Sequence, residues 1–105
     1  MIIDDARTDG MALGVFEAAK AAGKIDQVAV AGTDGIRQAE KSVAAGEMKA
    51  TVAEFPYDEG VLGVQMAIRL LACQPVPPWV VSPQAVITMD NVKDFRIPRP
   101  FPTRA

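Results

Sequence analysis

The chain has 105 residues, half of them apolar, which is enough for one modest core that needs no disulfide or metal. Its 11 basic and 13 acidic residues are spread without a run of one sign, which excludes the charged surface that nucleic acid or anionic lipid requires. The absence of histidine removes the commonest general base and metal ligand, and a single cysteine excludes a disulfide or a zinc site within one chain.

The first elements predict a strand followed by a helix. Residues 1–3 (MII) match the end of a short strand. The next stretch is rich in alanine and has apolar residues at helical spacing, so it predicts a helix near residues 9–22. Thr8 or Asp9 suits its N-cap, and Gly23 stands where helices often end.

The same order repeats in the next stretch. Residues 27–32 (QVAVAG) are apolar and β-branched, as in a strand that is buried on both faces. Residues 35–45 predict a second helix, which Gly46 ends. Asp34 stands between strand and helix and can cap that helix.

The remaining elements predict a third strand near residues 49–54, an amphipathic helix over residues 57–73 and a strand near residues 84–88. Cys73 lies in an apolar helical context, so we expect it to be a packing residue. Three of the last eight residues are proline, which predicts an extended tail over residues 96–105.

This alternation predicts an α/β fold with an open, mostly parallel sheet and flanking helices. In such sheets, ligands bind where the carboxyl ends of the strands meet the loops that enter the helices. Four polar residues fall at these ends: Thr8, Asp9, Asp34 and Glu54. Each alone is more often a helix cap than a ligand contact, but their convergence makes them candidate ligand-binding residues.

The chemistry of these groups favours a neutral polyol. An ionised carboxylate accepts hydrogen bonds from sugar hydroxyls, whereas Asp34 would repel a phosphate, and the segment GTDG lacks the glycine spacing and the lysine of phosphate loops. A magnesium site built from Asp9, Asp34 and Glu54 is a less favoured alternative. We therefore expect no cofactor and no metal.

The strings TDGMALGVFEAAKAAGK (residues 8–24) and VAVAGTDGIRQAEKSVAAGEMKATVAEFPYDEGVLGV (residues 28–64) resemble the C-terminal part of the type I periplasmic sugar-binding proteins, the ribose- and galactose-binding group of ABC transporters. That group reads approximately N-D-x-M-A-x-G-A, then G-x-D-G, then A-G-x-x-x-A-T-V-x-Q-x-P-x-x-x-G. The resemblance covers about residues 6–95. It implies a solute-binding function without catalysis.

In that family, the Asn of the first motif, the Asp of the second and the Gln of the third touch the sugar. By position they fall on Thr8, Asp34 and Glu54, and only Asp34 is the same residue type. The changes at the other two positions leave the identity of the sugar open. The resemblance therefore implies that Asp34 accepts a hydrogen bond from a sugar hydroxyl.

The family's receptors have two lobes that clamp the ligand, and this chain resembles only part of the second lobe. The resemblance divides it into residues 1–56 of the sugar-binding lobe, residues 57–95 returning toward the other lobe, and a tail, residues 96–105. We therefore expect a truncated fragment that binds sugar weakly on its own. The amphipathic helix over residues 57–73 lacks the segments that it would pack against in the family. We therefore also expect homo-oligomers, most simply a two-fold dimer that exchanges the segment after residue 56.

In the intact receptor, the partners implied are a monosaccharide or similar polyol and an ABC permease. The alternative is a fragment of the effector-binding domain of a LacI-type transcriptional regulator, whose third motif usually differs. An enzyme on the same sheet is disfavoured by the missing histidine and phosphate loop. The family is periplasmic, but MIIDDARTDG lacks the pattern of a signal peptide and no apolar run spans a bilayer, so as written we expect a cytoplasmic chain.

Overall fold

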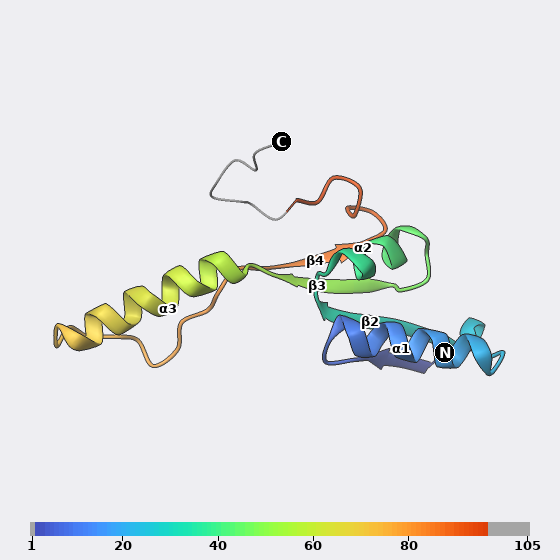
Figure 1. Cartoon of the computed structure of the whole chain (residues 1–105), viewed down its shortest axis with the longest axis horizontal. Coiled ribbons are helices and arrows are strands. Elements are labelled where there is room, and N and C mark those ends of the chain that lie inside the picture. The colour runs from blue at the N-terminus through green and yellow to red at the C-terminus, as the bar shows by residue number, and fades with distance from the viewer. Residues whose placement is uncertain (1, 97–105) are drawn as a thin grey trace. The chain divides into compact units, whose positions relative to one another are not determined.

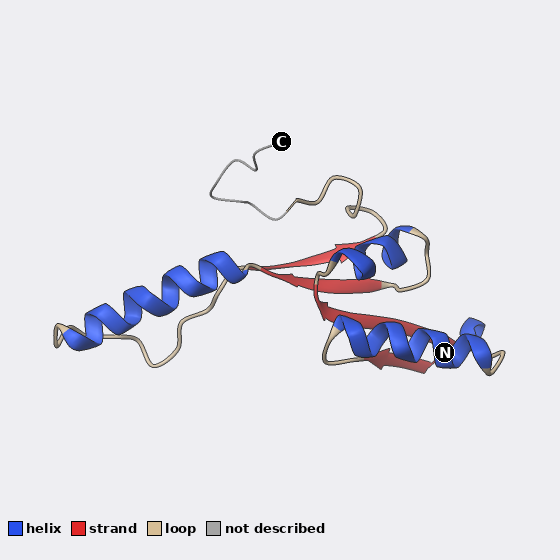
Figure 2. Ribbon diagram, in the orientation of Figure 1, coloured by secondary structure: helices blue, strands red, loops and turns tan. Residues whose placement is uncertain are grey.

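The computed structural model describes residues 2–96 and confirms the predicted α/β class (Figures 1 and 2). Every predicted helix and strand is present, with ends shifted by two residues at most. Among residues 2–96, no helix is long and apolar enough to cross a bilayer. In chain order the elements are β1 (Ile2–Asp5), α1 (Asp9–Ala21), the 3₁₀ turn η1 (Ile25–Gln27), β2 (Val28–Asp34), α2 (Arg37–Ala44), β3 (Ala50–Glu54), α3 (Pro56–Leu71) and β4 (Gln84–Thr88).

The four strands form one sheet in the order β1-β2-β3-β4. β1 pairs with β2 in parallel, from Ile2 opposite Val28 to Asp5 opposite Ala31. β2 pairs with β3 in parallel, and Asp34 stands opposite Ala53 at the end of that ladder. The carboxyl ends of β1, β2 and β3 therefore point to the same edge of the sheet, as the alternating sequence predicts.

The helix boundaries follow from local capping, with one correction. The Thr8 hydroxyl accepts a hydrogen bond from the Met11 amide at 3.3 Å and caps α1, as predicted. Gly23, just past α1, adopts the positive φ of 67° that a helix C-terminus favours. The prediction that Asp34 caps α2 is wrong, because the N-cap is Ile36 and no side chain caps that helix end. Asp34 is instead the last residue of β2.

The core lies where α1 and α2 pack against the central strands. Small residues let the backbones approach closely there, since Ala12, Ala39 and Ala53 are all completely buried. The larger apolar side chains that fill the remaining space are Phe16, Val30, Val43, Met48 and Ile87. This packing fixes the positions of the loops at the carboxyl edge of the sheet.

The described residues form two compact units, residues 2–54 with 85–96 and residues 55–84. The candidate site residues all belong to the first unit. In the second unit, α3 has no buried residue, and Cys73 just after it is exposed, so the expectation that Cys73 packs in a core is wrong. The division of the sequence after residues 56 and 95 stays a prediction, and apart from Arg96 the expected tail lies outside the described residues.

Candidate functional site

Three of the predicted site residues lie at the carboxyl edge of the sheet. Asp34 ends β2 and Glu54 ends β3, one position beyond the pair formed by Asp34 and Ala53. Thr8 follows β1 and begins α1 as its N-cap. All three residues are half-buried, so each keeps part of its surface open to a ligand. The parallel register thus places Asp34 and Glu54 at neighbouring strand ends, and Thr8 follows the carboxyl end of β1 at the same edge.

Asp34 has an unusual backbone conformation. Its φ is 129°, a region that side-chain-bearing residues rarely occupy and that costs on the order of 1–3 kcal/mol. Within residues 2–96, its carboxylate makes no hydrogen bond to the protein. A strained, half-buried residue with an unengaged carboxylate is a candidate ligand contact, because strained residues cluster at functional sites.

The fourth predicted residue, Asp9, is completely buried and fully engaged with the protein. Its Oδ2 accepts hydrogen bonds from the amides of Gly35 at 2.8 Å and Ile36 at 2.9 Å. Its Oδ1 accepts one from the Thr51 hydroxyl at 2.6 Å. A single carboxylate therefore ties the start of α1 to the β2–α2 turn and to β3. In this arrangement it presents no surface to a ligand.

Two glycines make room for this carboxylate and for the turn it holds. A Cβ on Gly32 would stand 2.5 Å from Oδ1 of Asp9, so only glycine lets the carboxylate approach β2 so closely. Gly35 has a φ of +77°, and a Cβ there would stand 2.7 Å from the Ala53 Cβ. Both positions are therefore set by close approach of the backbone.

The Asp9 carboxylate lies beside backbone amides at two helix ends. Asp9 is the first residue of α1, and it accepts from two amides immediately before α2. It thus lies at two helix N-termini, where partial positive charge favours an anion. Within residues 2–96 every buried side-chain nitrogen and oxygen has a hydrogen-bond partner, so this network is closed.

The magnesium alternative finds no support in this geometry. No group of three His, Cys, Asp or Glu side chains among residues 2–96 is placed to hold a metal ion. The Asp9 carboxylate is bonded to Thr51 inside the protein, so it is not available to share a metal ion with Asp34 and Glu54. The remaining carboxylates at the edge are suited to accept hydrogen bonds from a neutral ligand.

The partners of Asp9 are not evident in the sequence. Thr51, Gly32 and Gly35 look like ordinary strand and turn residues in the sequence, and their roles depend on contacts 16 to 42 residues apart. One signal was available: Thr51 is a hydroxyl residue at a position of β3 that alternation places on the buried face.

A hollow lies at the opposite edge of the sheet, where β2 begins. It measures about 330 Å³, and Phe16, Val28, Gly46 and Lys49 contribute to its lining. None of the predicted site residues borders it. The two edges of the sheet are therefore separate candidates for a ligand.

Comparisons with known proteins identify the family. Residues 6–75 match the model of the periplasmic binding protein domain. The D-allose-binding periplasmic protein of Escherichia coli K12 is 50% identical over 60 residues, which are 57% of this chain and 19% of that protein. The chain thus spans about a fifth of the length of that curated relative.

Solved structures of similar fold belong to the same class of protein. An ABC transporter periplasmic solute-binding protein from Actinobacillus succinogenes with bound D-allose superposes with a TM-score of 0.74 at 26% identity, over 90% of this chain and 33% of that one. An ABC transporter solute-binding protein from Bacillus halodurans with bound myo-inositol gives a TM-score of 0.69 at 30% identity, over 90% and 32%. These relatives do not favour the LacI-type alternative, and they are binding proteins. The chain belongs to the periplasmic binding protein domain family.

Proposed function

We propose that the carboxyl edge of β1, β2 and β3 is one wall of a binding site for a monosaccharide or a similar polyol. In the whole protein this wall would serve the solute-binding component of an ABC transporter in the periplasm, with a permease as partner and no catalysis. The bound D-allose and myo-inositol of the related structures support this class of ligand. Both are rings that carry several hydroxyl groups, for which carboxylates are good acceptors.

The observation that carries the proposal is the state of Asp34. Asp34 ends a central strand and is half-buried, and its carboxylate has no hydrogen-bond partner among residues 2–96. A half-buried acceptor without a protein partner gains a charge-assisted bond when a hydroxyl approaches. Helix capping does not explain its strained φ of 129°, since Asp34 does not cap α2.

The neighbours of Asp34 supply complementary groups. Glu54 offers a second carboxylate from the next strand. The Thr8 oxygen already accepts the Met11 amide, so its hydroxyl hydrogen is free to be donated to a ring oxygen or hydroxyl. Thr8, Asp34 and Glu54 together can satisfy a donor and acceptor pattern on one face of a polyol.

Asp9 is assigned an indirect part in this site. Its carboxylate holds the Gly35 and Ile36 amides, the two residues that directly follow Asp34. It therefore fixes the turn from which Asp34 projects. We treat it as a positioning residue, in place of the direct ligand contact expected from the sequence.

The chain alone is expected to bind weakly. Three hydrogen bonds on one open wall each compete with water and contribute on the order of 1 kcal/mol net, so the dissociation constant should be roughly millimolar or weaker. The chain covers about a third of the related solved chains, 33% and 32%, and residues outside it would supply the opposite wall.

The proposal is tested by ligand-observed NMR with D-allose, D-ribose and myo-inositol. The wild-type chain should give a saturable signal with at least one of them. Asp34→Ala should lower the affinity at least about fivefold, which corresponds to one lost hydrogen bond of about 1 kcal/mol. The matched control is Asp26→Ala, an exposed carboxylate in η1 that borders the hollow at the opposite edge, and it should change nothing if the ligand binds at the carboxyl edge. Equal loss in both variants would contradict the proposal.

A further inference from the structure

The side chain of Thr51 joins three segments of the chain through one hydroxyl. Thr51 lies on β3 and is completely buried. Its hydroxyl donates to Oδ1 of Asp9 at 2.6 Å and accepts from the Gly35 amide at 3.3 Å. These partners are 42 and 16 residues away in the sequence. One side chain therefore connects β3 to the start of α1 and to the turn between β2 and α2.

Both hydrogen-bonding functions of this hydroxyl are in use. A threonine hydroxyl has one hydrogen to donate and lone pairs that accept, and here the hydrogen goes to Asp9 while the oxygen accepts from Gly35. The Gly35 amide is shared with Oδ2 of Asp9, which accepts it at 2.8 Å. Because Gly35 is buried, its amide depends on these two acceptors. The network of Asp9, Gly35 and Thr51 therefore fixes the direction of this amide.

The fixed amide belongs to the peptide bond that follows Asp34. Asp34 and Gly35 have consecutive positive φ angles, 129° and 77°. The conformation of Asp34 is unfavourable, and such a conformation persists only when the surrounding structure imposes it. The Asp34 side chain makes no hydrogen bond among residues 2–96, so it does not supply this constraint. The adjacent fixed point is Gly35, which lies so close to β3 that a Cβ on it would stand 2.7 Å from the Ala53 Cβ.

We propose that Thr51 is a positioning residue of the sugar-binding wall, which holds Asp34 in its strained conformation through Asp9 and Gly35. This inference rests on the proposed function. Because Thr51 is completely buried, it acts on a ligand only through Asp34. Asp34 is then oriented before the sugar arrives, and binding does not have to order it. The alternative is that Thr51 adds stability and leaves the conformation of Asp34 unchanged.

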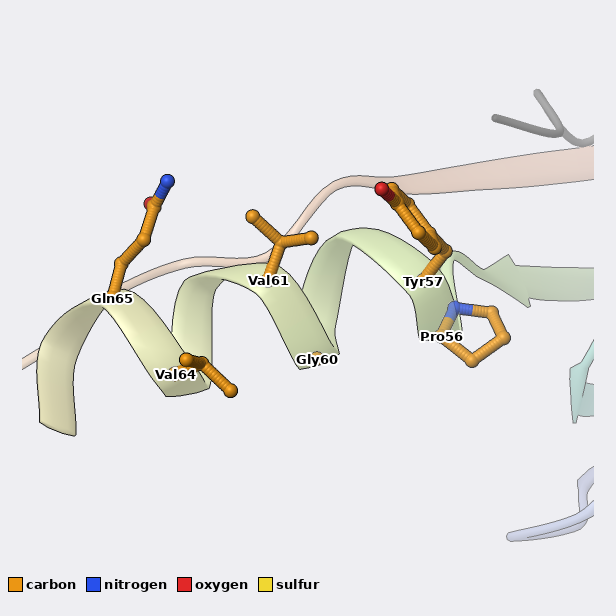
Figure 3. A pocket seen from close by; sticks show the side chains of 6 residues that line it. All are labelled: Pro56, Tyr57, Gly60, Val61, Val64 and Gln65. Atoms are coloured by element: carbon orange, nitrogen blue, oxygen red, sulfur yellow. The ribbon is translucent and has the colours of Figure 1, made fainter. Parts of the chain in front are cut away.

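The network belongs to the compact unit that also carries the carboxyl edge of the sheet. The apolar groove along α3, which Val61 and Val64 border (Figure 3), belongs to the other unit. No residue of the network borders this groove. Substitutions at Thr51 therefore test the carboxyl edge, and α3 should keep its helical content in them.

Amide NMR of the full chain tests the conformation of Asp34. The three-bond coupling between its amide and α hydrogens depends on φ, and a φ of 129° gives a smaller coupling than an extended strand. Thr51→Val should raise this coupling, because Asp34 relaxes toward an ordinary strand conformation. Thr51→Ser keeps the hydroxyl and should retain the wild-type coupling. The matched control is Thr88→Val, which should leave the coupling unchanged, since Thr88 is half-buried and its hydroxyl makes no hydrogen bond within residues 2–96.

Urea denaturation of Asp34→Gly tests whether Thr51 imposes the strain. Glycine adopts a φ of 129° without strain, so this substitution should raise the unfolding midpoint of the wild-type chain. In the Thr51→Val background the strain is already released, and the same substitution should raise the midpoint at most about half as much. In the Thr88→Val background the full rise should remain. If Thr51→Val does not fold, Thr51→Cys takes its place in both measurements, because a thiol is only a weak donor and acceptor.

A sugar titration connects this conformation to the wall. Thr51→Val should lower the affinity for D-allose or myo-inositol at least about threefold, and Thr51→Ser should retain it. The coupling and the urea midpoints need no sugar, so they judge the role of Thr51 separately from the proposed function, which Asp34→Ala tests. The proposal would be overturned by an unchanged Asp34 coupling in Thr51→Val, by an equal gain from Asp34→Gly in both backgrounds, or by a sugar affinity that Thr51→Val leaves unchanged.

Discussion

Removing the Asp9 carboxylate gives the most specific stability prediction. Asp9→Ala removes three hydrogen bonds: Oδ2 accepts from Gly35 at 2.8 Å and from Ile36 at 2.9 Å, and Oδ1 accepts from Thr51 at 2.6 Å. A hydrogen bond to a charged group contributes about 1.5–3 kcal/mol. The full sum is not lost, because Gly35 keeps a 3.3 Å bond to Thr51 and the exposed Ile36 can reach water. We expect a loss of about 3 kcal/mol in the free energy of unfolding, a large part of the total for a small domain.

A double-mutant cycle in urea denaturation checks this reasoning. Thr51→Val removes the hydroxyl while nearly keeping the shape, and should cost about 2 kcal/mol because Oδ1 of Asp9 loses its donor. Since both variants remove the same bond, the double variant should cost about 1–2 kcal/mol less than the sum. Asp9→Asn should be milder, because its amide oxygen can still accept from both backbone amides.

Two results would refute the account of Asp9. A cost below about 1 kcal/mol for Asp9→Ala would mean that the carboxylate does not hold the β2–α2 turn. Strict additivity of Asp9→Ala and Thr51→Val would mean that the 2.6 Å bond between them contributes nothing.

The remaining predictions concern single positions. Asp34→Gly should raise the stability by about 1 kcal/mol, because glycine accepts a φ of 129°, while sugar binding falls in the same NMR titration. Asp34→Asn should leave the melting temperature nearly unchanged and still lower the affinity for the sugar. Unfolding of this variant would show that Asp34 has a structural role. Gly32→Ala should lower the melting temperature strongly, since its Cβ would stand 2.5 Å from Asp9, whereas Gly14→Ala, a helical site with nothing within 4 Å, should raise it. Calorimetry of the isolated chain with monosaccharides should give dissociation constants of roughly millimolar or weaker, and micromolar binding would show that a second wall is present.

The sequence predicted the fold well because its signals are local. Apolar periodicity and glycine stops place α1 and α2, and Thr8 caps α1 as expected. The parallel order follows from alternating strands and helices. These features need only neighbouring residues, so a single sequence carries them.

The site was predicted less completely, because its key contacts are distant in sequence. Thr8, Asp34 and Glu54 do lie at the expected edge. Asp9 looked like a second polar group at the start of α1, yet it is buried and joined to Thr51, 42 residues away. The carboxylate that accepts the Ile36 amide just before α2 belongs to Asp9, and not to Asp34 as expected. Helix-capping rules consider only residues near the helix end, so they cannot predict this contact.

A two-dimensional amide NMR titration with D-allose and myo-inositol shows whether the carboxyl edge of the sheet is the proposed sugar-binding wall. We expect saturable shifts centred on the amides of Thr8, Asp34 and Glu54 and on the turn at Gly35, with a roughly millimolar midpoint. The same titration on Asp34→Ala should give weaker shifts. Shifts centred on the opposite hollow at Phe16 and Gly46, or no shift up to about 100 mM sugar, would contradict the claim.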